Sequence, residues 1–359
     1  MTDRATSRPS GASPLSRVKS GLQSLFPQIL AIFAAFVVGA VILTATGYDP
    51  VAVYSAMLQG AFGDTYGVGQ TLTQATPIIF TALSFLFAFK SGLFNIGAEG
   101  QLLLGSFAAA LVGILFKDLP AAVLVPLAVL AGGAAGALWA FVPAYLKAKV
   151  GAHEVITTMM FTYIATNLTG YFVNYPFKAP GWVAQTVLIG PSAELPRILP
   201  PTQLSASFIL AVGLAAAVYW VLQRTTLGYE VRASGLNPSA SENAGISVKR
   251  TMVLAFMVSG ALAGIGGAGE VLGVHYRFIQ GFSPGYGFDG LAVALVGGLN
   301  PLGTVLAALL FGALRSGSMQ MMRVTHVPSD IVVVLQALVI IFVAAPTLIR
   351  LVMKRRRRP

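Results

Sequence analysis

The stretch FNIGAEGQLLLGS, residues 94–106, places one carboxylate and three glycines between long apolar runs. Apolar residues fill most of the segment from Pro77 to Phe116, which is about 40 residues long. As a single helix this segment would extend about 60 Å, twice the thickness of the hydrocarbon core of a membrane. The sequence therefore predicts a break within residues 90–100, where glycines and Asn95 interrupt the apolar pattern.

The composition indicates a membrane protein. Of the 359 residues, 56% are hydrophobic and 10% are charged, and the mean hydropathy is +0.78. Soluble domains carry about 25% charged residues. We predict an all-α, polytopic helical membrane protein with about ten transmembrane helices, or eight as the alternative. Segments of suitable composition occur at residues 27–46, 70–90, 94–116, 120–146, 152–174, 205–222, 251–272, 288–299, 303–322 and 330–352.

The basic residues predict the orientation of the chain. The net charge is +11, and Lys and Arg cluster at both ends and within residues 224–250. Short basic segments mark the cytoplasmic side of membrane proteins. We therefore expect a cytoplasmic basic leader (1–26), a single transmembrane domain (27–352) and a basic cytoplasmic tail (353–359). The six prolines of residues 175–203 predict an external loop.

A second interrupted segment lies late in the chain, at GFSPGYGFDGLAVALVGGLNPLG, residues 281–303. As in the first segment, an acidic residue precedes a run of small apolar residues. The apolar part, 288–299, is too short to cross alone, so it is either a half-helix or is completed by 303–322. Paired broken helices in the two halves of a transporter point to a central substrate site. The sequence thus predicts an internal pseudo-repeat and a transport pathway between its halves.

Six residues of the two broken segments are candidates for this pathway. Acidic groups within a membrane span are costly and mark functional sites. For Glu99 and Asp289 the alternative is a structural role, in which they accept backbone N–H bonds at a helix break or pair with Lys90 or Arg277. Asn95 both donates and accepts, which suits hydroxyl-rich ligands, and the aromatic rings stack on a base or sugar or pack against neighbours. The candidates are Phe94, Asn95, Glu99, Tyr286, Phe288 and Asp289.

The polar segment LGYEVRASGLNPSASENAGISVKR, residues 227–250, predicts a short helix between two membrane spans. Asn237 suits an N-cap and Pro238 the first turn, and Gly245 stands where the helix should end. We expect a helix at 238–244 on the cytoplasmic side, with an ordinary polar loop as the alternative. A partner protein that binds a rigid helix between two membrane spans can move those spans through it.

Several long motifs resemble the permease subunits of ABC importers, in the binding-protein-dependent branch for nucleosides or simple sugars. The resemblance covers roughly residues 70–350 and leaves out the N-terminal leader. The motifs that carry it are FNIGAEGQLLLGS, AHEVITTMMFTYIA (152–165), GYEVRASGLNPSASENAGI, SGALAGIGGAGEVLG (259–273) and GYGFDGLAVALVGGLNPLG (285–303).

This resemblance implies a complex in the cell inner membrane. It contains a second, usually paralogous permease, a cytoplasmic ATPase that binds ATP, and an extracytoplasmic substrate-binding protein. The segment 235–246 matches the coupling helix that docks into the ATPase, although Ser239-Ala240-Ser241 stands where two alanines are more usual. The residues implied in this role are Gly235, Leu236, Asn237, Pro238, Ala240, Glu242 and Gly245.

The expected function is therefore a non-catalytic, substrate-translocating subunit for a nucleoside or a simple sugar. The chain has no GxxxxGK[ST] loop, so ATP belongs to the partner and we expect no cofactor in this chain. We also expect no metal site, and His153-Glu154 is interpreted as a helix cap. The alternatives are an ion-coupled secondary transporter and an intramembrane enzyme, which needs a nucleophile and a base in one cavity. The sequence leaves open the exact substrate and whether the permeases are identical.

Overall fold

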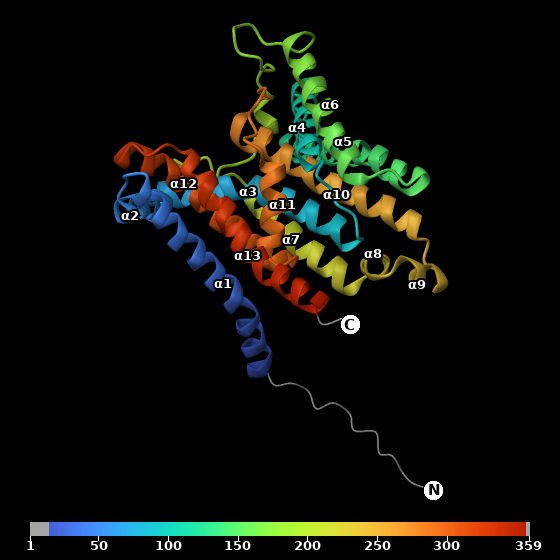
Figure 1. The fold of residues 1–359 in the computed structure, drawn as a ribbon. Coiled ribbons are helices and arrows are strands. Elements are labelled where there is room, and N and C mark those ends of the chain that lie inside the picture. Colours follow the sequence, from blue (N-terminus) through green and yellow to red (C-terminus); the bar gives the residue numbers. More distant parts are fainter. Residues whose placement is uncertain (1–13, 357–359) are drawn as a thin grey trace. The chain divides into compact units, whose positions relative to one another are not determined.

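The computed structural model describes the backbone of residues 14–356 and the side chains of residues 30–343 (Figure 1). The predicted all-α class is confirmed: the described chain contains helices and two isolated β-bridges but no β-strand. The parts of the expected leader and tail at 1–13 and 357–359 lie outside the described residues. The helices are α1 (Pro14–Ala45), α2 (Pro50–Phe62), α3 (Thr65–Lys90), α4 (Ala98–Leu115), α5 (Ala121–Val150), α6 (Glu154–Asn174), α7 (Ser207–Arg224), α8 (Thr226–Leu236), α9 (Pro238–Asn243), α10 (Val248–Glu270), α11 (Tyr286–Val296), α12 (Pro301–Thr325) and α13 (Asp330–Arg356).

Six helices of the described chain are long and apolar enough to cross a membrane, namely α3, α4, α5, α7, α10 extended to His275, and α12. Each of the ten predicted spans coincides with a helix, but the number that crosses the membrane stays a prediction. Helices α2 and α8 were not predicted. The chain divides into two compact units, one made of residues 51–332 and the other of residues 1–50 with 333–359. The first unit holds every candidate residue.

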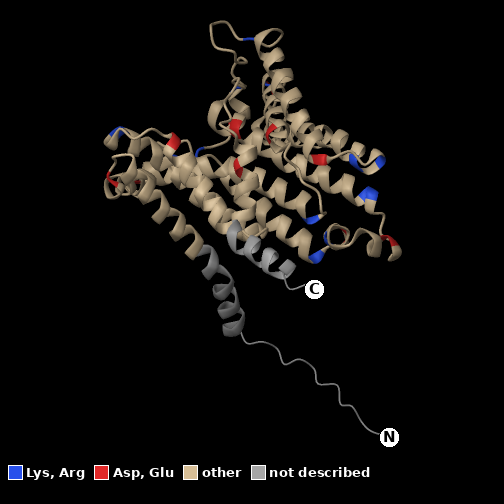
Figure 2. Ribbon diagram, viewed as in Figure 1, with Lys and Arg blue, Asp and Glu red and all other residues tan. Residues whose placement is uncertain are grey.

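Helix α3 forms the core of the unit 51–332. It packs against α10, α11 and α12, and Figure 1 shows it running through the middle of these helices. Side chains all around α3 are buried, and Phe80, Phe85 and Phe87 are among the largest fully buried ones. A helix that is apolar all round belongs in an interior. Figure 2 shows most Lys and Arg toward helix ends, while several acidic residues lie within the bundle.

Glycines bring α4, α5 and α10 into close contact. A Cβ atom at Gly264 of α10 would overlap the carbonyl oxygen of Gly132 on α5, and one at Gly105 of α4 would overlap the backbone of Gly264. Gly136 and Gly260 approach each other in the same way. Small residues at such positions allow membrane helices to pack backbone against backbone. The glycine-rich run of α10 is therefore a packing surface.

Replacing Gly264 by leucine should destabilise the fold, because the side chain would force three helices apart. Overpacking of this kind costs about 1–3 kcal/mol or more. The thermal melting midpoint of the detergent-purified protein measures the effect. Gly213→Leu on α7 is the control, because nothing lies within 4 Å of a Cβ atom at that position. An unchanged midpoint for Gly264→Leu would mean that these helices are not in close contact.

Both predicted breaks are present. Helix α3 ends at Lys90, the chain turns at Gly92 with φ of +80°, and α4 begins at Ala98. Helix α11 has 11 residues, which is about 16 Å, half the hydrocarbon thickness. A turn through Gly298 and Leu299, both with positive φ, then leads into α12. The segment 288–299 is therefore a half-helix rather than the start of a longer span.

The expected loop at 175–203 is irregular apart from a short 3₁₀ turn at Pro191–Ala193. Its backbone is held by the end of α4 and by the chain that follows α10. The amide N of Gly190 donates to the carbonyl O of Gly113 at 2.9 Å, and those of Thr186 and Ile189 donate to the carbonyl O atoms of Phe278 and Tyr276. This loop therefore lies at the same end of the bundle as the C-terminal end of α4.

Candidate functional site

The starts of α4 and α11 meet inside the bundle. Glu99, in the first turn of α4, is 7% exposed, and its Oε2 accepts a hydrogen bond of 2.6 Å from the backbone N of Gly287 in α11. A Cβ atom at position 287 would overlap the Glu99 backbone, so this approach requires glycine. The carboxylate thus lies close to the N-termini of two helices, where free N–H groups and helix dipoles favour negative charge.

A second acidic group, Asp289, lies in the first turn of α11, two residues after Gly287. Asp289 forms an ion pair with Arg315 of α12, with 2.5 Å between Oδ2 and a guanidinium nitrogen, and the two side chains are 20% and 18% exposed. The same guanidinium lies 5.1 Å from the ring centre of Tyr286. The Tyr286 hydroxyl donates to Oε1 of Gln74 on α3 at 3.1 Å. We call these five residues, Gln74, Glu99, Tyr286, Asp289 and Arg315, the central cluster.

The central cluster draws on four helices and combines both signs of charge with an amide and a phenol. It brings together three of the six predicted pathway residues, Glu99, Tyr286 and Asp289. The alternative prediction, that the acids pair with Lys90 or Arg277, is wrong, because the ion-pair partner of Asp289 is Arg315. The expectation that an acid accepts a backbone N–H bond at a helix break is confirmed for Glu99.

Sequence reasoning missed Arg315 and Gln74. Arg315 is the only charged residue of the predicted span 303–322, and a charge within a span is itself a sign of function. That signal was available in the sequence. Gln74 carries no charge, so nothing in the sequence separates it from the other polar residues of α3.

Asn95 lies outside the central cluster and holds the first break together. It is 1% exposed. Its side-chain nitrogen donates to Oε1 of Gln101 and to Oγ of Ser259, at 2.9 and 2.8 Å, and its oxygen accepts from the backbone N of Gly97 at 2.9 Å. Ser259 of α10 in turn donates to the carbonyl O of Ser84 at 2.7 Å. Asn95 therefore ties the break to α10 and, through Ser259, to α3.

The remaining two aromatic candidates differ in their surroundings. Phe94 packs edge-on against Phe85 and Phe89, with ring centres 4.9 and 5.9 Å apart. Phe288 of α11 is 44% exposed. Glu270 of α10 is buried, with 3% exposed, and lies 3.7 Å from His275. Phe94 is thus a packing residue, while Phe288 presents an open ring.

The pair His153-Glu154 lies at the start of α6. His153 has the N-cap position, although its side chain makes no capping hydrogen bond, and Glu154 lies in the first turn. The Glu154 carboxylate pairs with Lys147 near the end of α5 at 2.8 Å. The pair therefore joins the two helices at the turn between them.

The predicted short helix is α9, with Asn237 as its N-cap. The Asn237 Oδ1 accepts from the backbone N of Ala240 at 3.1 Å, and Gly245 follows with φ of +85°. Every residue of α9 is exposed except Ser241, which donates to the carbonyl O of Asn237 at 2.9 Å. Leu236, just before it, is 88% exposed. The segment thus presents a rigid, mostly uncovered surface.

Gly235 links this surface to the first break. A Cβ atom at Gly235 would overlap the carbonyl O of Lys90 and lie 2.9 Å from the backbone N of Gly92. The backbone before α9 therefore touches the end of α3, where the chain turns toward α4 and Glu99. The segment that joins α8 to α9 is therefore in direct backbone contact with the first break.

Half-helices that meet inside an apolar bundle around buried charges define a multi-pass membrane transport protein. Residues 67–344 match the family described as the branched-chain amino acid transport system / permease component. The chain belongs to this family and is a permease subunit of an ABC importer, without a catalytic role of its own. The family favours ATP-driven uptake over the ion-coupled alternative.

Three curated relatives show the range of the family. The guanosine ABC transporter permease protein NupP of Bacillus subtilis is 40% identical, over 94% of this chain and 98% of its own length. The glucose ABC transporter permease protein TsgB13 of Haloferax volcanii is 37% identical, over 88% and 85%. The guanosine ABC transporter permease protein NupQ of Bacillus subtilis is 30% identical, over 69% and 80%. No solved structure matches the chain significantly.

Proposed function

We propose that this chain and a second, paralogous permease together import nucleosides across the inner membrane, powered by a cytoplasmic ATPase and supplied by an extracytoplasmic binding protein. The meeting of α4 and α11 around Glu99 carries the proposal, because it places polar groups at the centre of an apolar bundle. NupP, named for guanosine, supports a nucleoside as the solute. NupP and NupQ are two guanosine permease proteins of one organism, which supports a paired arrangement.

Within this proposal the six predicted residues have different roles. Glu99, Tyr286 and Asp289 border the path of the solute, and the exposed ring of Phe288 stacks on its base. Phe94 and Asn95 act indirectly, by fixing the break that positions Glu99. Amide, phenol, carboxylate and guanidinium groups suit a neutral solute that both donates and accepts hydrogen bonds.

Uptake of radiolabelled solutes by a strain that lacks this permease tests the substrate. Cells that carry the intact importer should take up guanosine and other nucleosides, and deletion of the gene should abolish this uptake. Glucose, a pentose and a branched-chain amino acid are the competitors. Uptake of glucose without any nucleoside uptake would place the chain with sugar importers.

The proposed orientation puts both termini and residues 224–250 in the cytoplasm, with 175–203 outside. Since the protein has no native cysteine, single cysteines report the side of each segment. We predict that an impermeant thiol reagent labels Lys178→Cys on intact cells but labels Ser239→Cys only after the cells are opened. Both residues are exposed, so access does not depend on unfolding. The reverse pattern would mean an inverted topology.

Helix α9 and the residues around it form the proposed contact with the ATPase. The exposed residues Leu236, Asn237, Pro238, Ala240 and Glu242 form the docking surface. Gly235 and Gly245 delimit it, and Gly235 carries its movement to the first break. A rigid helix held by two packed helices is suited to transmit such a movement.

A further inference from the structure

A polar pocket of about 430 Å³ lies at the opposite end of α3 from Gly235. It is bordered by α2, the turn into α3, the first turns of α3 and the C-terminal half of α12. Its volume falls within the roughly 300–1,000 Å³ of small-molecule sites. In the proposed orientation the pocket is extracytoplasmic, on the side from which a solute arrives. None of the six predicted pathway residues lines it.

Small residues allow the helices around the pocket to approach closely. A Cβ atom at Gly60 of α2 would lie 2.5 Å from the Cβ of Gln320 on α12. The backbone of Gly317 on α12 similarly touches the Met57 backbone of α2. Asp64 is the N-cap of α3, and its Oδ1 accepts from the backbone N of Gly67 at 2.6 Å. The walls of the pocket are thus fixed by backbone contacts and by a helix cap.

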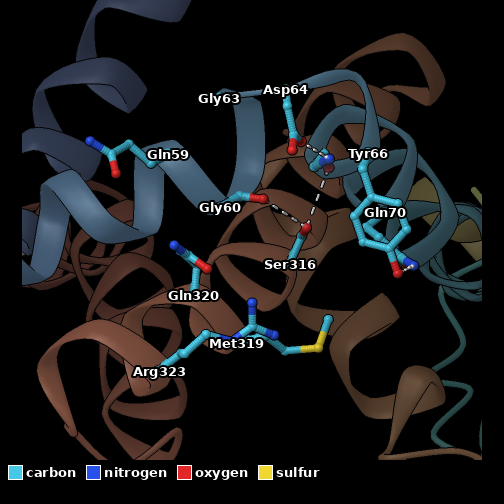
Figure 3. Close-up of a pocket in the computed structure, with 11 residues that line it drawn as sticks. Gln59, Gly60, Gly63, Asp64, Tyr66, Gln70, Ser316, Met319, Gln320 and Arg323 are labelled. Carbon is cyan, nitrogen blue, oxygen red and sulfur yellow. Dashed lines mark hydrogen bonds between the residues drawn. The ribbon is translucent and has the colours of Figure 1, made fainter.

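The side chains that line the pocket are mostly uncharged and polar. Figure 3 shows the amides of Gln59 and Gln320 on one side of Ser316, with Tyr66 and Gln70 on the other. The Gln70 side-chain nitrogen donates to the Tyr66 hydroxyl at 3.0 Å, which orients both groups. Three carboxamides and a phenol offer donors and acceptors to a ligand together with the face of a ring.

The charges of the pocket balance. Asp64 contributes one carboxylate and Arg323 one guanidinium, and no ion pair joins them among the described residues. A balanced pocket does not attract an anion or a cation over a neutral solute. Its carboxylate accepts from hydroxyls and its guanidinium donates to carbonyl or ring acceptors. This chemistry fits the sugar and the base of a nucleoside.

Two helices contribute residues both to the pocket and to the central cluster. Gln70 lies one turn before Gln74 on α3, and Ser316 follows Arg315 on α12. Gln70 and Ser316 line the pocket, whereas Gln74 and Arg315 belong to the central cluster. Residues four apart share a helix face, so the polar face of α3 continues inward from the pocket.

We propose that this pocket is a first binding subsite, which holds a nucleoside before it reaches the central cluster. The inference rests on the proposed import function and orientation, and it adds a second position on the path of the solute. Amides of Gln59, Gln70 and Gln320 bind the base edge and the ribose hydroxyls, and the ring of Tyr66 borders the base.

Protection of a single cysteine by substrate tests this subsite directly. In the purified importer, Gln320→Cys should react with a thiol reagent, and saturating guanosine should slow the reaction about tenfold, as expected if about nine-tenths of the sites are occupied. Lys178→Cys, in the loop at 175–203, is the control and should react equally with and without guanosine. Gln59→Cys provides a second position in the same pocket. Equal labelling of both pocket cysteines with and without guanosine would overturn the proposal.

Transport kinetics separate binding in the pocket from an indirect effect. Gln320→Leu and Gln70→Leu should each raise the KM for guanosine uptake about tenfold, through loss of hydrogen bonds to the solute. Met322→Leu, two residues after Gln320 on α12 but outside the pocket, should leave KM unchanged. Protection without any change in KM would mean that guanosine alters the labelling from a distance, and would also overturn the proposal.

A wrong import function and a wrong subsite give different experimental results. If the unmodified importer takes up glucose and no nucleoside, the proposed substrate is wrong, and the same protection experiment with glucose then decides on the pocket. Protection by glucose would retain the subsite for a different neutral solute. If guanosine is imported but does not protect the pocket cysteines, the subsite is wrong and the import function stands.

Discussion

Alanine in place of Gly235 should abolish the stimulation of ATP hydrolysis by substrate. A Cβ atom there would overlap the carbonyl O of Lys90, so the backbone before α9 would have to move away from the first break. Helix α9 itself would keep its capping bond from Asn237 and its exposed surface. We therefore expect normal retention of the ATPase but hydrolysis at the basal rate, measured on the reconstituted complex with its binding protein.

Gly213→Ala on α7 is the matched control, because a Cβ atom at that position meets nothing within 4 Å. A second variant separates transmission from docking. Ala240 is exposed on α9, so Ala240→Arg should leave the fold intact but reduce the amount of ATPase that co-purifies. Coupling requires that both sites act on one element with two states. Full stimulation in Gly235→Ala would show that the contact with Lys90 and Gly92 plays no part in coupling.

The sequence predicts those features that depend on local pattern. The break after Lys90 follows from the length of the apolar run, and α9 from Asn237-Pro238. For 288–299 the sequence left two alternatives, and the structure has the half-helix α11. Helix α2 was missed because its 13 residues are too few for a span, and α8 because its sequence is polar. These two helices lie outside the pattern that identifies membrane segments.

The partners of the polar residues were not predictable from the sequence. Asp289 and Arg315 lie on different helices, and only the packing of α11 against α12 brings them together. Asn95 was predicted to be a pathway residue, and its hydrogen bonds to Gln101 and Ser259 hold the first break to its neighbours. The polar pocket combines α2 and α3 with the distant α12, so no single stretch of sequence reveals it.

The stability of the fold should depend on Asp289 and Arg315 being paired, whereas transport should depend on the identity of each side chain. Arg315→Gln alone leaves the Asp289 carboxylate without its partner inside an apolar bundle. Breaking a fully buried pair in this way costs about 3–5 kcal/mol, and the partial exposure of both side chains makes the expected loss smaller. We expect a fall in the yield and melting midpoint of the purified protein, whereas Arg224→Gln at the exposed end of α7 should change neither.

Neutralising both partners, with Asp289→Asn and Arg315→Gln, should restore much of the stability, because no charge is then left unpaired. Amide groups of similar size also keep the shape of the site. If the pair only holds α11 to α12, guanosine uptake should return together with the fold. If the two side chains border the path of the solute, as proposed, uptake should stay low in a protein that folds and assembles normally. Normal uptake by the folded double variant would assign the pair to bracing alone and leave Glu99, Tyr286 and Phe288 as the groups that contact the solute.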